Sequence, residues 1–189
     1  MLHLNYIYGE LMMTDAGLRR LASTMKVLTL VGMVATAAAA VLTLTTFDEL
    51  AAAALARYDI AYDPARFGWD SRLTVMGLWT VGPLLLIGGL WRLRRAFGEA
   101  AEGRPFSAVS TSGFRGFAAA ILAWAIYKPV VAAISTLVLS VVGGPGGGKL
   151  AVDIGTDTLA SIFVALLVLV MAQIFDRGRA LAEENAAFL

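Results

Sequence analysis

The sequence contains no cysteine and a single histidine, His3, close to its N-terminus. The absence of cysteine excludes disulfides, thiolate metal sites and a cysteine nucleophile. One histidine in a terminal segment cannot form an imidazole cluster within one chain, and the carboxylates are spaced too irregularly for a metal motif. We therefore expect no catalytic residue, no metal and no cofactor, and we expect that the protein is not an enzyme.

Charged residues are also scarce, at 15% of 189 residues, whereas 59% of the residues are hydrophobic and the mean hydropathy is +0.75. This composition is too apolar for an ordinary soluble domain and indicates a membrane protein. The net charge of +1 gives no sign of a nucleic-acid partner. We expect contact with membrane lipids and no direct contact with nucleic acid.

Four apolar runs are long enough to cross a bilayer, which takes about 20 residues per helix. They predict spans at about 27–46, 73–91, 117–142 and 158–175. The expected fold is an all-α membrane protein, an antiparallel four-helix transmembrane bundle whose helices extend into the cytoplasm. Residues 1–26 would form an N-terminal tail and a basic cytoplasmic helix, and residues 27–189 a single four-span membrane domain.

Lysine and arginine side chains are distributed unevenly between the predicted loops. With the N-terminus inside, ten of the fifteen lie in cytoplasmic segments and four in outer segments, and Lys128 lies within a span. Because positive residues are retained on the cytoplasmic side, we expect a multi-pass inner-membrane protein with both termini in the cytoplasm.

Lys128 is the only formal charge in the third predicted span, and Pro129 follows it. A lysine at the bilayer centre costs about 3 kcal/mol on insertion scales, so a neighbour must compensate it. No carboxylate lies inside the other three predicted spans, so the expected partners are hydroxyls and carbonyls, with Thr36 among them. Trp124 shares the helix face of Lys128 at spacing i, i+4, and Tyr127 lies beside it.

Three interpretations of this lysine remain open. It stabilises the bundle from inside, it binds an anionic lipid head group or small ligand, or it carries protons or substrate in transport. The ligand hypothesis assigns binding to Lys128, Tyr127, Trp124 and Thr36.

Two cytoplasmic segments, the 92–106 hairpin and the 176–189 tail, carry charges suited to a protein partner. The hairpin supplies arginines and an apolar anchor, and the tail supplies carboxylates; the residues concerned are Arg92, Arg94, Arg95, Phe106, Glu183 and Glu184. The alternative is that these groups solvate helix ends, attract anionic lipids and pair with one another.

The same segments carry a resemblance to a known family. The stretch LWRLRRAFGEAAEGRPFSAVSTSGFRGFA contains a Gly-x-x-Phe-Ser turn at Gly103, Phe106 and Ser107, and the chain closes with IFDRGRALAEENAAFL. From about Gly17 onward the chain resembles the domain of unknown function 2975 family. The resemblance implies a bacterial four-span inner-membrane protein, often encoded beside a small helix-turn-helix regulator, and it brings no catalytic residues.

The sequence therefore favours a non-enzymatic regulatory or sensory membrane protein that binds a cytoplasmic partner, for which the helix-turn-helix regulator is the implied candidate. The alternative is a module that binds or transports a lipid or amphiphile through a pocket at Lys128. The small residues Gly32, Thr36 and Ala40 recur every four positions in the first span. They either pack inside the bundle or form a homodimer face.

Overall fold

The protein is described by a computed structural model over residues 15–57, 62–143, 148 and 155–186. Within these ranges it consists of five α-helices and a short 3-10 turn. The elements are α2 (Asp15–Thr45), α3 (Phe47–Ala56), η1 (Pro64–Arg66), α4 (Trp69–Ala101), α5 (Ala108–Gly143) and α6 (Thr156–Ala186). Four of the helices, α2, α4, α5 and α6, are long and apolar enough to cross a membrane. The predicted all-α, four-span fold is confirmed.

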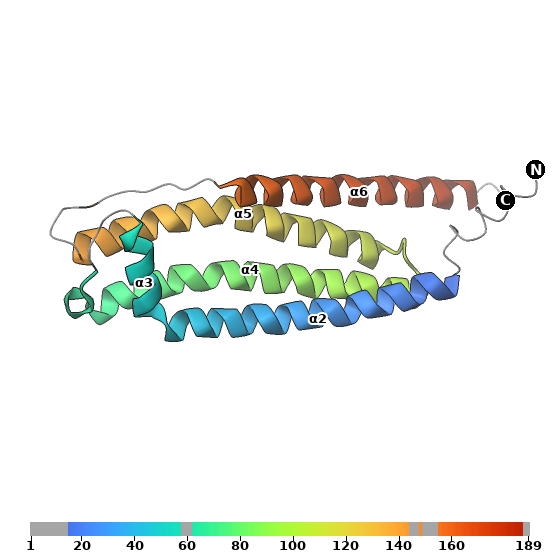
Figure 1. The fold of residues 1–189 in the computed structure, drawn as a ribbon. Helices are drawn as coiled ribbons and strands as arrows, with labels where there is room; N and C mark the ends of the chain where they lie inside the picture. The colour runs from blue at the N-terminus through green and yellow to red at the C-terminus, as the bar shows by residue number, and fades with distance from the viewer. Residues whose placement is uncertain (1–14, 58–61, 144–147, 149–154, 187–189) are drawn as a thin grey trace, which may run out of the picture.

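The four long helices run antiparallel in sequence order and lie side by side as α2, α4, α5 and α6 (Figure 1). Residues 102–107 join α4 to α5, and we call this the hairpin end of the bundle. The opposite end, where α3 lies across the long helices, is the α3 end. Contacts of α2 with α4, of α4 with α5 and of α5 with α6 hold the bundle together, so α2 and α6 form its outer helices.

The long helices exceed the thickness of a bilayer core. Helix α5 has 36 residues, about 54 Å at 1.5 Å per residue, against a hydrocarbon core of about 30 Å. Ser107 caps the start of this helix, since its hydroxyl oxygen accepts a hydrogen bond from the Ser110 amide at 3.1 Å. The basic N-terminal segment and the first span form one continuous helix, α2.

Small residues bring α4 and α5 close together. A Cβ atom at Gly82 would overlap the ring of Trp124, and one at Gly89 would lie 2.6 Å from the Cβ of Ala120. Helix backbones in membranes approach one another where such residues remove the side chain. The predicted stripe of the first span also faces inward, because Gly32 lies against Leu90 of α4.

The short helix α3, which follows Thr46, is part of the core. Phe47, Ala51 and Leu55 are buried in a cluster with Phe67, Val75 and Leu139. The hydroxyl of Thr46 does not cap α3; it donates to the carbonyl oxygen of Leu42 at 2.9 Å. Burial of three side chains, one turn apart or nearly so, therefore fixes α3 against α4 and α5.

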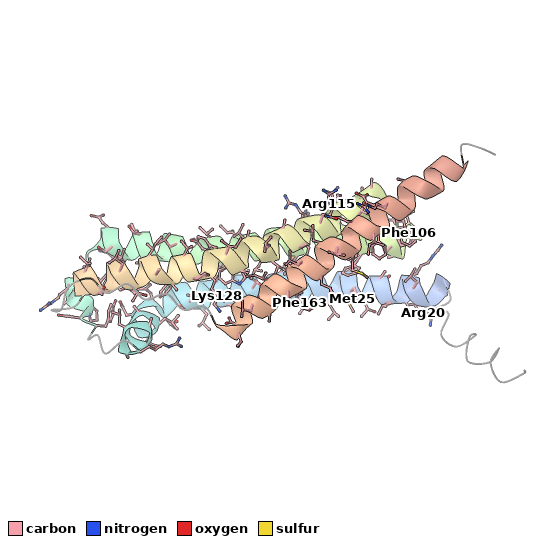
Figure 2. The ribbon with its side chains drawn as sticks, turned by 90° about the horizontal axis from the view of Figure 1, so that it is seen from above. Arg20, Met25, Phe106, Arg115, Lys128 and Phe163 are labelled. Carbon is pink, nitrogen blue, oxygen red and sulfur yellow. The ribbon has the colours of Figure 1, made fainter. Side chains whose placement is uncertain are left out.

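Helix α6 is displaced along α5 toward the hairpin end. It begins at Thr156, beside the middle of α5, although α5 continues to Gly143 (Figure 1). Seen from above, α6 runs obliquely across α5, with Lys128 near its first turn (Figure 2). This displacement determines which groups meet Lys128.

Candidate functional site

Lys128 forms an ion pair with Asp157, in the first turn of α6. The expectation that only hydroxyls and carbonyls reach this lysine is therefore wrong. The reason is the displacement of α6: a helix starting level with the end of α5 would place Asp157 far from Lys128. Lys128 lies roughly 18 Å along α5 from Gly116, which contacts Arg92, and so falls near the middle of the apolar stretch of this helix. Both side chains of the pair are partly exposed, Lys128 at 42% and Asp157 at 63%.

A second ion pair joins the same two helices at the hairpin end. Arg115 of α5 bonds Asp176 of α6 at 3.3 Å. Beside it the rings of Phe106 and Phe175 meet edge to face, with their centroids 5.6 Å apart. Helix α6 packs mainly on α5, and these contacts attach it near both ends of its membrane-crossing part.

A cavity of about 310 Å³ adjoins the Lys128–Asp157 pair at the α3 end. Its lining mixes charges, hydroxyls and apolar side chains from α3, α4, α5 and the start of α6. The residues are Ala54, Leu55, Arg57, Trp79, Lys128, Val131, Ala132, Ser135, Thr136, Leu139, Gly155 and Asp157. Arg57 forms no ion pair with any carboxylate in the described part of the chain. Among the described lining residues, two cations, Arg57 and Lys128, therefore face one carboxylate, Asp157.

Packing at the α3 end fixes the walls of this cavity. The indole Nε1 of Trp79 donates to the hydroxyl oxygen of Ser135 at 3.0 Å. The ring of Trp79 also contacts that of Phe47, with centroids 5.3 Å apart. Leu55 and Leu139, both fully buried, close the apolar side. Trp79, Ser135, Leu55 and Leu139 thus form a wall that is fixed by packing and by one hydrogen bond.

The structure separates the four residues that the ligand hypothesis assigned to Lys128. Only Lys128 lines the α3-end cavity. Trp124 and Thr36 line a different cavity of about 290 Å³ between α2, α4 and α5. The Tyr127 hydroxyl donates to the carbonyl oxygen of Leu78 at 2.8 Å, which links α5 to α4. The Thr36 hydroxyl donates within its own helix, to the carbonyl oxygen of Gly32 at 2.8 Å.

Sequence reasoning missed Arg57, Asp157, Ser135 and Thr136 as cavity residues. Asp157 directly precedes the predicted fourth span, 158–175, but nothing in the sequence indicates how far that span is displaced along α5. Arg57 lies just after α3, and the burial of this helix was not predicted from the sequence.

At the hairpin end the predicted partner-binding residues divide into separate groups. Arg94 and Arg95 line a cavity of about 250 Å³ with Lys26, and Arg92 and Arg95 line one of about 210 Å³. Phe106 is exposed. Glu183 and Glu184 lie on the last turns of α6, and their side chains lie outside the described part of the structure.

A polar cluster outside the spans secures the segment between α3 and α4. The Tyr62 hydroxyl donates to the Asp48 carboxylate at 2.6 Å, and Arg72 pairs with the same carboxylate at 2.9 Å. Burial, and then the hydrogen bond to Asp48, raise the pKa of Tyr62 to about 12. The cluster thus favours the neutral phenol.

No group of three or more acidic or histidine side chains in the described ranges lies close enough to hold a metal ion. The fold and the site together define a multi-pass membrane protein with a polar cavity between its helices. A family model described as protein of unknown function (DUF2975) matches residues 69–187. The chain belongs to this family, and the match covers α4, α5 and α6. No curated protein and no solved structure matches the chain.

Proposed function

We propose that this protein is a non-enzymatic membrane sensor that binds a small anionic amphiphile in the α3-end cavity. The observation that carries the proposal is the lining of that cavity. Arg57 has no ion-pair partner there among the described residues, and the Lys128–Asp157 pair beside it joins the middle of α5 to the start of α6. Ligand pockets of about 300–1,000 Å³ typically combine apolar walls with a few placed polar groups, and this cavity fits the lower end of that range.

The lining also supports the chemistry of the ligand. Arg57 suits a carboxylate or phosphate, because its guanidinium offers several donors in a fixed plane. Val131 and Leu139 suit a short apolar chain. A ligand with an anionic group and a short apolar chain would form charge-assisted hydrogen bonds with Arg57 and would cover the apolar wall.

Binding would reach α6 through Lys128. An anion next to the ammonium competes with Asp157 for it, which loosens the first turn of α6. The Arg115–Asp176 pair would hold the other end of the span in place, so α6 would tilt rather than detach. The ligand shifts α6 from the paired to the tilted arrangement only if it binds the tilted arrangement more tightly.

The orientation proposed for this sensor places the hairpin end in the cytoplasm of a bacterial cell and the α3-end cavity toward the outer face of the inner membrane. The excess of lysine and arginine in the segments near the hairpin end supports it. Both termini would then be cytoplasmic, and the ligand would enter from outside or from the outer leaflet.

The test is binding of decanoate to the protein in lipid nanodiscs. Binding is measured by the fluorescence of Trp79, which is obtained by subtracting the signal of a Trp79→Phe variant from that of the wild type. Arg57→Gln should weaken binding by roughly 10-fold or more, since hydrogen bonds to charged groups contribute about 1.5–3 kcal/mol. Arg66→Gln, an exposed arginine at the same end, is the matched control. Decanol, with the same chain and no charge, should bind weakly. Equal decanoate binding by the wild type and Arg57→Gln would refute the proposal.

A second function, binding of a cytoplasmic partner, is favoured by a different observation. The Phe106–Phe175 contact brings the hairpin and the start of the tail together as one surface, and α6 continues to Ala186 beyond it. The implied partner is a small helix-turn-helix regulator. A two-hybrid assay with that regulator should lose its signal on Phe106→Ser and on removal of residues 177–189, which leaves Asp176 in place. An unchanged signal with both variants would exclude this surface.

A further inference from the structure

The seam between α4 and α5 contains an apolar groove of about 510 Å³ that ends at an arginine. The groove is lined by Leu84, Leu85, Gly88, Gly89, Trp91, Arg92, Ala119, Ala120 and Ala123. Gly88 is exposed, and a Cβ atom there would meet nothing within 4 Å. The small residues thus leave an open channel along the membrane-crossing part of the two helices.

The polar end of the groove opens into two smaller cavities. Arg92 lines both the groove and a cavity of about 210 Å³ that also contains Arg95 and Ser112. Arg95 lines a further cavity of about 250 Å³ with Lys26 and Arg94. The apolar channel and the cationic cavities therefore share side chains and form one continuous surface.

Arg92, Arg94 and Arg95 form no salt bridge in the described part of the chain, although Arg95 lies near enough to Glu99 to add to the effect of Arg104 in lowering the pKa of that carboxyl. Glu99 and Glu102, which border the cavity of Arg94, are paired with Arg104 instead. The Nε atom of Arg94 is buried and has no hydrogen-bond partner in the described structure. Among the described residues the surface thus has more cations than carboxylates, and at least one buried donor, Arg94 Nε, has no acceptor.

Packing holds Arg92 at the end of the groove. The space that a side chain would occupy at Gly116 is filled by the Cδ and Cγ atoms of Arg92, so the arginine lies across α5. Trp91, half exposed beside it, has the amphipathic ring that settles at the level of lipid head groups. The cation is therefore set at the level where a phosphate group lies.

From this arrangement we propose a binding site for one anionic phospholipid on the α4–α5 seam. An acyl chain lies in the Gly88–Gly89 groove, and the phosphate binds Arg92 and Arg95. Basic cavities between transmembrane helices are suited to anionic head groups. Arg92 and Arg95 have no salt bridge among the described residues, so charge complementarity favours an anionic phospholipid as the occupant. The site is separate from the α3-end cavity, so it stands or fails independently of the proposed sensor function.

The test is native mass spectrometry of protein released from vesicles of phosphatidylglycerol and phosphatidylcholine with identical chains. Wild type should retain phosphatidylglycerol in preference to phosphatidylcholine. Arg92→Gln and Arg95→Gln should each reduce retained phosphatidylglycerol about fivefold. Arg20→Gln, an exposed arginine that lies on α2 at the hairpin end (Figure 2), should change nothing.

Gly88→Leu tests the groove without disturbing the arginines, because the added side chain enters open space. It should reduce retention of both lipids. Gly77→Leu is its matched control, since Gly77 is an exposed glycine of α4 with equally open surroundings and lies outside the groove. Equal retention of the two lipids by wild type, or Gly88→Leu behaving as Gly77→Leu does, would overturn the site. Helical circular dichroism of each variant checks that it is folded.

Discussion

A close contact between α4 and α5 yields a prediction whose size follows from the structure. At Gly82 an added Cβ would lie 2.5 and 2.6 Å from two atoms of the Trp124 ring, Cε3 and Cη2, and would overlap a third. Favourable carbon–carbon separations are about 3.5–4.0 Å, so the helices or the indole must move. Overpacking of this kind costs about 1–3 kcal/mol, and Gly82→Ala should lower the free energy of unfolding by that amount.

The assay is unfolding in mixed micelles, measured by circular dichroism. It includes a matched control variant and a second substitution that should restore part of the lost stability. Gly77→Ala, on the same helix with nothing within 4 Å, should change stability by less than about 0.5 kcal/mol. Trp124→Phe removes the outer ring atoms that meet the new carbon, so the double variant should recover part of the loss. Equal effects at Gly82 and Gly77, or no coupling with Trp124, would refute the close packing of α4 on α5.

Two further predictions concern ion pairs and pH. Lys128→Met and Asp157→Asn should each destabilise the protein, and by the same unfolding assay the double variant should lose less than the sum of the two single losses, because the two groups pair with each other. Additivity at Lys128 would contradict the pairing. Because the pKa of Tyr62 is raised from 10.0 to about 12, its contribution to stability should be complete below pH 10 and lost as the pH rises through about 12. Tyrosinate absorbance of wild type minus Tyr62→Phe measures this titration, and a midpoint near 10 would contradict it.

The sequence was sufficient to predict the elements that depend on neighbouring residues along the chain. Apolar run lengths predicted the four spans, and the Gly103–Ser107 turn predicted where α4 ends and α5 begins. Gly103 has a φ of +84°, a conformation that glycine adopts without strain. The family resemblance was confirmed over 69–187, a shorter stretch than the expected extent from Gly17.

The candidate site could not be predicted because it depends on relative helix position. Hydropathy gives the length of a span and contains no information about its displacement along a neighbour. The partner of Lys128 follows from where α6 begins beside α5, and the position of Arg57 follows from the burial of α3. Trp124 and Lys128 share a face at i, i+4, yet they line different cavities because α2 covers only the former.

The most direct measurement of the sensor claim is the distance between α5 and the start of α6. Because the chain has no native cysteine, spin labels can be attached specifically at Ile134 and Leu159, which are exposed and outside the cavity lining. Saturating decanoate should shift or broaden this distance distribution, while labels at Ser112 and Ile174 near the hairpin end stay unchanged. A distribution at Ile134–Leu159 unaffected by decanoate, or shifted equally by decanol, would contradict the proposed coupling of the cavity to α6.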